Sequence, residues 1–284
     1  MKGNRSLYIL LSLLGLCIAF SPAAAEIYHE KRAEQAAKRY ETSISSCARD
    51  EMATMLEAAR DYNAALIGKH LKNIYIPAER DESSPYYSLL NQTGDGCMGT
   101  VEIPCIDVTL PIYHFTDSAS LEAGAGHLQG SSLPVGGIGT HTVLIAHRGL
   151  PGQRLFTDLD SVTVGDVFYL HVLGQTLAYE VDSTEVVPPE DAASLAIDEE
   201  KDKCTLVTCT PDAVNDMRLL VHGIRTEDAA PSQAEDTSHR ISLRPVSKQA
   251  CFAAAGILAA LLISIAVDVV KNKRQRPGRD ETSR

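Results

Sequence analysis

An eight-residue stretch, C-T-L-V-T-C-T-P at residues 204–211, places the strongest constraint on the fold of this chain. Its centre is a short run of β-forming residues, and it ends at Pro211, which cannot donate a hydrogen bond to a sheet ladder. Cys209 is therefore expected where a buried strand emerges into a loop. A second β-run begins at Arg218. If the two runs form a hairpin around residues 212–216, the thiol and the guanidinium lie side by side.

Composition narrows the class of protein. A chain of 284 residues predicts one or two domains, and 44% hydrophobic residues are enough for a substantial core. Aromatic residues are only 5% and Trp is absent, so the core is expected to be aliphatic. The net charge of -11 argues against a nucleic-acid-binding protein, which needs a basic face. The seven Cys and the nine His show no zinc-type spacing, so we do not expect a structural metal.

The first 25 residues resemble a targeting segment. Lys2 and Arg5 precede an apolar run at 7–20, and S-P-A-A-A follows at 21–25. This order is typical of a secretory signal peptide with a small-residue cleavage site. The alternative is an uncleaved N-terminal membrane anchor; we favour cleavage.

A second apolar segment, residues 250–270, is predicted to cross a membrane. At about 1.5 Å per helical residue it would extend about 31 Å, the thickness of a bilayer core. Residues 271–284 form a basic tail, and positive charge marks the cytoplasmic side. The polar stretch 227–249 is predicted to be a linker. We therefore expect a membrane-tethered protein, single-pass or two-pass, whose middle part is extracytoplasmic.

Between these segments, helical and β patterns separate clearly. Residues 26–85 form a helical N-terminal region, with helix predicted over 26–68 and a stripe of apolar residues, including Met52 and Met55, that indicates packing. After Gly94 the pattern changes to short β-runs, which suggest a closed barrel or a sandwich. The predicted strands are 98–103, 108–113, 142–146, 167–172, 177–187, 205–208 and 219–224.

A nucleophilic thiol needs a base or ion-pair partner, and His is the usual choice. His147 ends the apolar run 142–146, so it has the same strand-end placement as Cys209. His114, His127 and His141 are the other candidates, and spacing favours His147 only modestly over His127 and His141. The other histidines are less suitably placed: His29 and His70 in the helical region, His171 and His222 inside β-runs, and His239 in the linker.

Several motifs follow one another between residues 86 and 226. They are Y-Y-S-L-L-N at 86–91, G-D-G-C-M-G at 94–99, L-P-I-Y-H at 110–114, G-H-L-Q-G-S-S-L-P-V-G-G at 126–137, A-H-R-G at 146–149, T-L-V-T-C-T-P at 205–211 and M-R-L-L-V-H-G from 217. Together they resemble the sortase family, and in particular its class C, the pilin-polymerising sortases. The resemblance implies a mainly β fold, a closed sortase-type barrel preceded by helices and followed by a transmembrane helix.

The resemblance assigns a role to each of three residues. Cys209 would be the nucleophile, His147 its acid–base partner and Arg218 the group that stabilises the oxyanion. The implied reaction cleaves an LPxTG-like sorting signal between Thr and Gly through a Cys thioester. A Lys amine of a pilin subunit then resolves the thioester, which polymerises pili on a Gram-positive surface.

The sequence departs from class C in the segment that usually forms a lid over the cysteine. Asp81 is present, but Glu82 and Ser83 replace the Pro and the aromatic residue that usually follow. We therefore expect a reduced or absent aromatic plug and a site that is open at rest, with Asp81 as a possible lid residue.

Three other functions are also compatible with this sequence. The acceptor amine could belong to the cell-wall precursor, which would make the protein a surface-anchoring sortase. Water could be the acceptor, which would make it a cysteine endopeptidase, or the barrel could be a non-catalytic surface binding module. Cys97, Cys105 and Cys204 could contribute one disulfide or stay free thiols, and the sequence assigns no pair.

Overall fold

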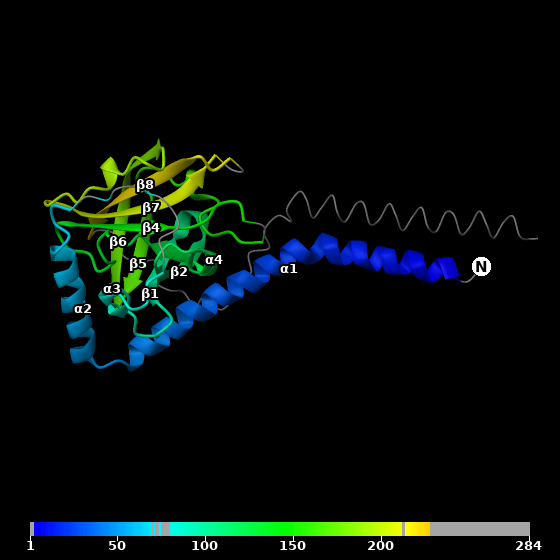
Figure 1. Cartoon of the computed structure of the whole chain (residues 1–284), viewed down its shortest axis with the longest axis horizontal. Coiled ribbons are helices and arrows are strands. Elements are labelled where there is room, and N and C mark those ends of the chain that lie inside the picture. The colour runs from blue at the N-terminus through cyan, green and yellow to red at the C-terminus, as the bar shows by residue number, and fades with distance from the viewer. Residues whose placement is uncertain are drawn as a thin grey trace, which may run out of the picture. The chain divides into compact units, whose positions relative to one another are not determined.

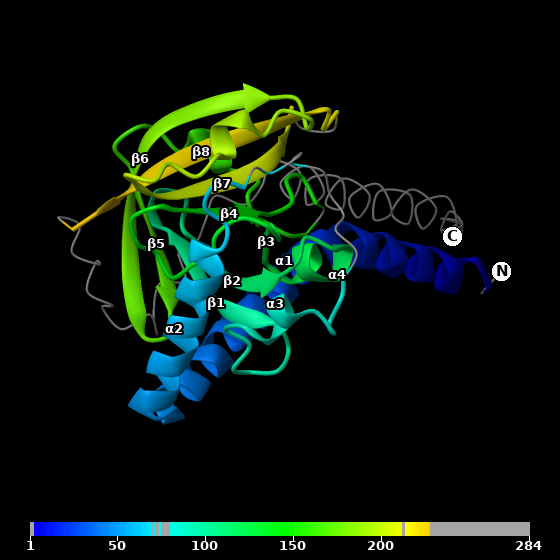
Figure 2. The ribbon, with the colours of Figure 1, turned by 60° about the vertical axis from the view of Figure 1, so that its left-hand side comes forward.

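Eight strands pair into a closed barrel in the order β1-β2-β3-β4-β7-β8-β6-β5, in a computed structural model that describes residues 3–69, 71, 74, 80–150, 152–211 and 214–227 (Figure 1). Closure leaves the sheet without free edges that could pair with another chain. Figure 2 shows β4, β7 and β8 side by side. The strands are β1 Cys97–Ile103, β2 Val108–His114, β3 Ala125–His127, β4 Thr140–Ile145, β5 Val167–Val172, β6 Gln175–Val187, β7 Asp202–Thr210 and β8 Met217–Thr226.

Alternation along the strands divides their side chains between two apolar clusters. Because successive residues of a strand point to opposite faces, Leu206 and Val221 join the first, larger cluster, while Val207 and Leu220 join the second. Strand β4 is almost entirely buried, and its Val143 also belongs to the second cluster. The strands β4, β7 and β8 are therefore packed on both faces, which explains their continuous apolar character.

Two long helices precede the barrel, α1 at Gly3–Ser46 and α2 at Arg49–Ala64. Tyr40 of α1 is buried, and its hydroxyl accepts a hydrogen bond from the backbone N–H of Leu173 at 2.9 Å. Met52 and Met55 of α2 pack against the first cluster, so the predicted packing role of this stripe is confirmed. The shorter elements are α3 Pro85–Ser88, α4 Ser118–Ala123 and the 3-10 turns η1 Pro104–Ile106, η2 Leu159–Ser161 and η3 Ala193–Leu195.

The predicted barrel is confirmed, with three differences in detail. The single helix predicted over 26–68 is two helices, because the chain is extended at Ala48 (φ -68°, ψ 145°). The short strand β3 was not predicted, since its A-G-H sequence carries no β-forming run. Several strands are longer than predicted, while β5 has the predicted bounds. The six described cysteines, including Cys97, Cys105 and Cys204, are free thiols.

The ends of the chain bear on the membrane predictions. Among the residues that the structure describes, no helix is both long enough and apolar enough to cross a bilayer. The predicted transmembrane segment 250–270 and the basic tail lie outside the described residues, as does nearly all of the linker. Helix α1 passes through the predicted leader, and removal of that leader stays a prediction.

Asn63 joins α2 to the barrel through a two-way backbone contact. Its side-chain amide donates to the carbonyl of Leu133 at 3.1 Å, and its side-chain oxygen accepts from the N–H of Leu133 at 2.6 Å. Both residues are buried, so water cannot replace these bonds at low cost.

Replacing Asn63 with Ala is expected to lower the free energy of unfolding by about 2–3 kcal/mol, because the buried N–H of Leu133 loses its acceptor. Urea unfolding of the full-length protein measures this difference. The exposed Glu57→Ala change in the same helix is the control, expected within about 0.5 kcal/mol of the wild type. Equal stability of the two variants would contradict the assigned role of Asn63.

Candidate active site

The hairpin of β7 and β8 brings Cys209 and Arg218 together. The antiparallel register pairs these two residues directly, with Thr208 opposite Leu219 and Thr210 opposite Met217. Strand β7 ends at Thr210, one residue before Pro211, as the sequence predicts. Cys209 is a free, partly exposed thiol at this strand end. The predicted hairpin is therefore confirmed, and it pairs these two residues across the strands.

Arg218 is buried but has unused hydrogen-bonding capacity. Its Nη1 donates to the carbonyl oxygens of Asn215 at 3.1 Å and Met217 at 2.9 Å, which fix the guanidinium against the β7–β8 turn. The side chain is only 8% exposed, yet its Nε has no partner within the described part of the chain. A buried donor without an acceptor is costly in a folded protein. Because Nε itself is closed to solvent, an incoming acceptor would reach it only after the side chain or the adjoining turn moves.

The two side chains lie on the same face of the sheet. Val207 is two residues before Cys209, and Leu220 is two residues after Arg218, so the period of two places all four side chains on the face that carries the second cluster. Ile145 of the neighbouring strand β4 belongs to the same cluster and pairs with Val207. This face is therefore where the ends of three strands meet.

His147 reaches this position from β4, which runs parallel to β7. The N–H of Ala146 donates to the carbonyl of Val207 at 3.1 Å, and the hydroxyl of Thr208 donates to the carbonyl of Ala146 at 2.9 Å. These two bonds extend the pairing of the strands past the end of β4. They tie the residue before His147 to the residue before Cys209, so the two ends cannot move apart independently.

Hydrogen bonding separates His147 from the three other candidate histidines. Each of those three is buried, and each uses both ring nitrogens in contacts between parts of the fold, so none is available to a substrate. Burial lowers the pKa of His127 and of His141 to about 4. The partners are the carbonyls of Gly96 and Leu89 for His114, the Tyr86 hydroxyl and the Ser132 carbonyl for His127, and the Ala196 carbonyl and the Thr205 hydroxyl for His141.

His147 is half-buried, and no described residue forms a hydrogen bond with its ring. Burial lowers the pKa of its imidazole, and the carboxylate of Glu122 opposes this shift. Glu122 is exposed and lies in α4, next to Leu121, which packs into the second cluster. The ends of the three strands therefore carry one thiol, one imidazole and one guanidinium, and the imidazole has no hydrogen-bonding partner among the described residues.

Such a set of groups suits acyl transfer. A thiol can attack a carbonyl carbon, an imidazole can carry the proton to and from the leaving and entering groups, and a guanidinium N–H can stabilise the oxyanion. No group of three or more His, Cys, Asp or Glu side chains in the described ranges is arranged to hold a metal ion.

Asp81 is not brought to these three residues by any contact in the described structure. Its carboxylate accepts hydrogen bonds from the backbone N–H and the hydroxyl of Ser83, at 3.0 and 2.6 Å, and these bonds hold its pKa below the ordinary value. The contact forms a local turn ahead of α3. A lid role for Asp81 stays a prediction.

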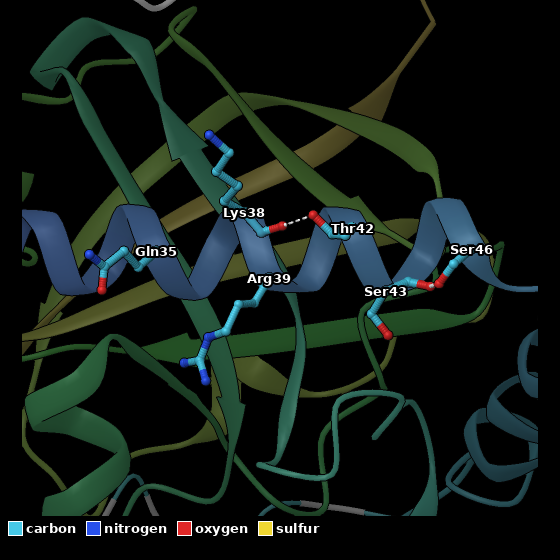
Figure 3. Close-up of a pocket in the computed structure, with 6 residues that line it drawn as sticks. All are labelled: Gln35, Lys38, Arg39, Thr42, Ser43 and Ser46. Atoms are coloured by element: carbon cyan, nitrogen blue, oxygen red, sulfur yellow. Dashed lines mark hydrogen bonds between the residues drawn. The ribbon is translucent and has the colours of Figure 1, made fainter.

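A shallow pocket lies elsewhere, on α1, and does not compete with this site. Figure 3 shows its six polar lining residues along one helix, with the Thr42 hydroxyl donating to the carbonyl of Lys38 at 2.7 Å. It contains neither a thiol nor an imidazole. Its lining residues are Gln35, Lys38, Arg39, Thr42, Ser43 and Ser46.

Sequence reasoning missed two contributors to the site. Thr208 immediately precedes Cys209, but its bond to Ala146 depends on the parallel pairing of β4 and β7, which residue spacing does not specify. Glu122 acts on His147 across the fold from α4. The one available signal was Asp117, an N-cap whose carboxylate accepts from the N–H groups of Ala119 and Ser120 and so predicts the start of that helix.

Comparison with known proteins gives one consistent family. The family model described as the sortase domain matches residues 101–226. Sortase D of Bacillus subtilis is 30% identical over 131 residues, which cover 46% of this chain and 63% of that protein, less than two thirds of its length. Sortase A of Listeria monocytogenes is 24% identical over 222 residues, which cover 78% of this chain and 90% of that protein.

The solved structures agree with this family. Streptococcus pneumoniae sortase C is 41% identical, with a TM-score of 0.65, over 69% of this chain and 99% of that one. Streptococcus agalactiae sortase C1, solved in complex with MTSET, is also 41% identical, with a TM-score of 0.60, over 68% of this chain and 98% of that one. The resemblance inferred from the motifs, class C included, is confirmed.

Replacing Glu122 with Gln is expected to lower the pKa of His147 further, because the carboxylate favours the charged imidazolium. The acidic limb of the profile of kcat/KM against pH should then move to lower pH. If the reaction uses thiolate and imidazolium together, the plateau should also fall, because fewer molecules hold both charges at once. Steady-state rates of the full-length protein on a cleavable peptide, measured across pH, test this.

The control is Glu57→Gln, which removes an exposed carboxylate from α2. It should leave the profile where it is in the wild type. An acidic limb that stays in place, or moves to higher pH, in the Glu122→Gln variant would show that Glu122 does not act on His147.

Proposed function

The chain belongs to the sortase family, whose members are cysteine transpeptidases, and from that premise we propose that it is a pilin-polymerising enzyme of class C. Cys209 is the nucleophile, His147 the acid–base group and Arg218 the oxyanion donor. The observation that carries this proposal is the pairing of Cys209 with Arg218 in the β7–β8 register, with an unpartnered Nε on a buried guanidinium.

The first half-reaction forms the acyl-enzyme. The sulfur of Cys209 attacks the Thr carbonyl carbon of an LPxTG-like signal, and the carbonyl electrons move onto oxygen, where Arg218 Nε–H donates to the oxyanion. The tetrahedral intermediate collapses, the Thr–Gly bond breaks, and His147 gives a proton to the leaving Gly amine. The product is a thioester on Cys209 and a free C-terminal fragment.

The second half-reaction transfers the acyl group. A Lys amine of the next pilin subunit attacks the thioester carbonyl while His147 accepts the proton of that amine. The carbon–sulfur bond breaks, an isopeptide bond remains, and Cys209 returns as a thiolate. His147 returns as an imidazolium, so the site is charged for the next cycle. No cofactor enters either step.

Contacts in the described structure support catalysis over a binding module that has merely kept the barrel. Both ring nitrogens of His114, His127 and His141 form hydrogen bonds within the fold. The ring of His147 forms none with any described residue. Arg218 is buried with a free donor at considerable cost to folding. A surface used only for binding would not need these two groups beside a thiol.

We place the barrel outside the cytoplasmic membrane of a Gram-positive cell, tethered by the predicted segment 250–270. LPxTG-bearing pilins or surface proteins are the proposed donors. The proposed resting state is open, since Glu82 and Ser83, and not a Pro-aromatic pair, directly follow Asp81, and Cys209 is partly exposed. The chain segment ahead of Asp81 does contribute Ile74, which is fully buried in the second cluster.

Incubating the full-length protein with an LPxTG-type peptide and a pilin-derived Lys peptide should give an amide-joined product and the released Gly fragment. The Cys209→Ala variant should lose the product by at least about a thousandfold, as when a covalent nucleophile is removed. Mass spectrometry identifies each species. Cell-wall-precursor amine in a parallel sample tests the anchoring alternative.

Three other outcomes of this experiment would each indicate a different function. Product only with the cell-wall amine would make the protein an anchoring sortase. Hydrolysed peptide without amide product would indicate an endopeptidase. An unlabelled Cys209 after treatment with a thiol-reactive sorting-signal analogue, together with no cleavage, would favour the binding module and contradict the proposal.

A further inference from the structure

The loop that follows His147 is attached to the barrel by three consecutive residues. The carbonyl of His147 accepts from the N–H of Phe156 at 3.1 Å, and the N–H of Gly149 donates to the hydroxyl of Thr157 at 3.2 Å. Between them, the Nη2 of Arg148 donates to a carboxylate oxygen of Asp160 at 2.7 Å. The loop is thus closed by two bonds of its backbone and one ion pair.

The residues that these three contacts reach are held in place by core packing. Phe156 and Leu159 are fully buried in the first cluster, and Asp160 lies in the turn η2 directly after Leu159. Thr157 lies between the two buried residues. The groups that receive the loop are therefore fixed by core packing, and they can serve as reference points for the residues beside His147.

Attachment of this backbone matters because no hydrogen bond from a described residue orients the ring of His147, whereas in many nucleophile–His pairs a third group does so. The position of its own backbone therefore contributes directly to where the imidazole points. A small displacement of a reacting group can lower a rate by up to about a hundredfold.

We propose that the ion pair of Arg148 with Asp160 is a positioning device for His147. The pair holds the residue after the imidazole against η2, so that the ring faces Cys209 without a hydrogen-bonding partner of its own. Arg148 and Asp160 contact neither the thiol nor the proposed oxyanion donor in any described interaction, so they act through His147. This inference rests on the proposed function only for its rate measurements.

Burial of the Arg148 side chain distinguishes this pair from an ordinary surface ion pair. The side chain of Arg148 is 13% exposed, so solvent screens its charge less than it would on an open surface. The same loop contains a second pair, Arg154 with Asp158, at 2.7 Å and with 30% of the Arg154 side chain exposed. That pair bonds within one turn of the loop and does not adjoin His147. Arg154 also donates from Nη1 to the carbonyl of Asp107 at 3.4 Å, so Arg154→Gln removes more hydrogen bonds than Arg148→Gln does, which makes it a strict control.

The test compares Arg148→Gln, Asp160→Asn and the double variant with Arg154→Gln in the full-length protein. The first two should lower kcat by about tenfold with KM unchanged, and the double variant should fall no further, because both changes remove the same contact. Arg154→Gln should keep the wild-type kcat. Thermal unfolding midpoints should be similar in all variants, whereas a merely structural role would lower the midpoint.

A readout that needs no transpeptidation is the rate of Cys209 alkylation by iodoacetamide across pH. In the wild type this rate should show an inflection from His147, which the His147→Ala variant lacks. Arg148→Gln and Asp160→Asn should weaken the inflection, and Arg154→Gln should keep it. If wild-type protein forms no amide product, the proposed function fails, while this profile still decides the role of the ion pair.

Three results would overturn the inference: wild-type kcat and alkylation profile in both single variants, an equal loss in Arg154→Gln, or losses that multiply in the double variant. Asp160 has a side chain that is 52% exposed, so Asp160→Asn decides the matter if Arg148→Gln does not fold.

Discussion

The antiparallel pairing of β7 with β8 is the interaction on which the rest of the site depends. Its register sets Cys209 opposite Arg218, and the period of two along each strand turns both side chains to the same face of the sheet. β4, parallel to β7, delivers His147 to that face, and the hydroxyl of Thr208 closes the remaining gap between the strand ends. A one-residue slip in this pairing would move one of the two groups to the opposite face.

The fold uses its polar groups unequally. Around the barrel, buried imidazoles and Asn63 pair with backbone groups and so join segments that are distant in sequence. At the ends of β4, β7 and β8, Arg218 Nε and the ring of His147 have no hydrogen-bonding partner among the described residues. Other buried atoms, such as Arg225 Nη1, are unpartnered too, so the placement of these two groups at the strand ends beside Cys209 is what distinguishes them.

Local patterns in the sequence were sufficient to predict most barrel strands and the pairing of Cys209 with Arg218. These features depend on runs of β-forming residues and on Pro211, which influence only the few residues around them. They were not sufficient for β3, whose A-G-H sequence forms a strand only because β2 and β4 flank it. The choice of His147 over His114, His127 and His141 needed the resemblance, since each of those lies near a predicted strand end or loop. Only tertiary hydrogen bonds separate them physically. Glu122 and the Arg148–Asp160 pair act across the fold, so spacing could not reveal them.

The proposed mechanism requires the buried, unpartnered donor of Arg218 to meet the oxygen of the reacting carbonyl. A crystal structure of the protein covalently trapped at Cys209 with a sorting-signal analogue tests this requirement. The analogue's oxygen should lie about 2.7–3.1 Å from Arg218 Nε, with Nη1 still bound to the β7–β8 turn. An oxygen held only by backbone N–H groups, with the guanidinium turned away or Nε bonded to a protein acceptor, would contradict it.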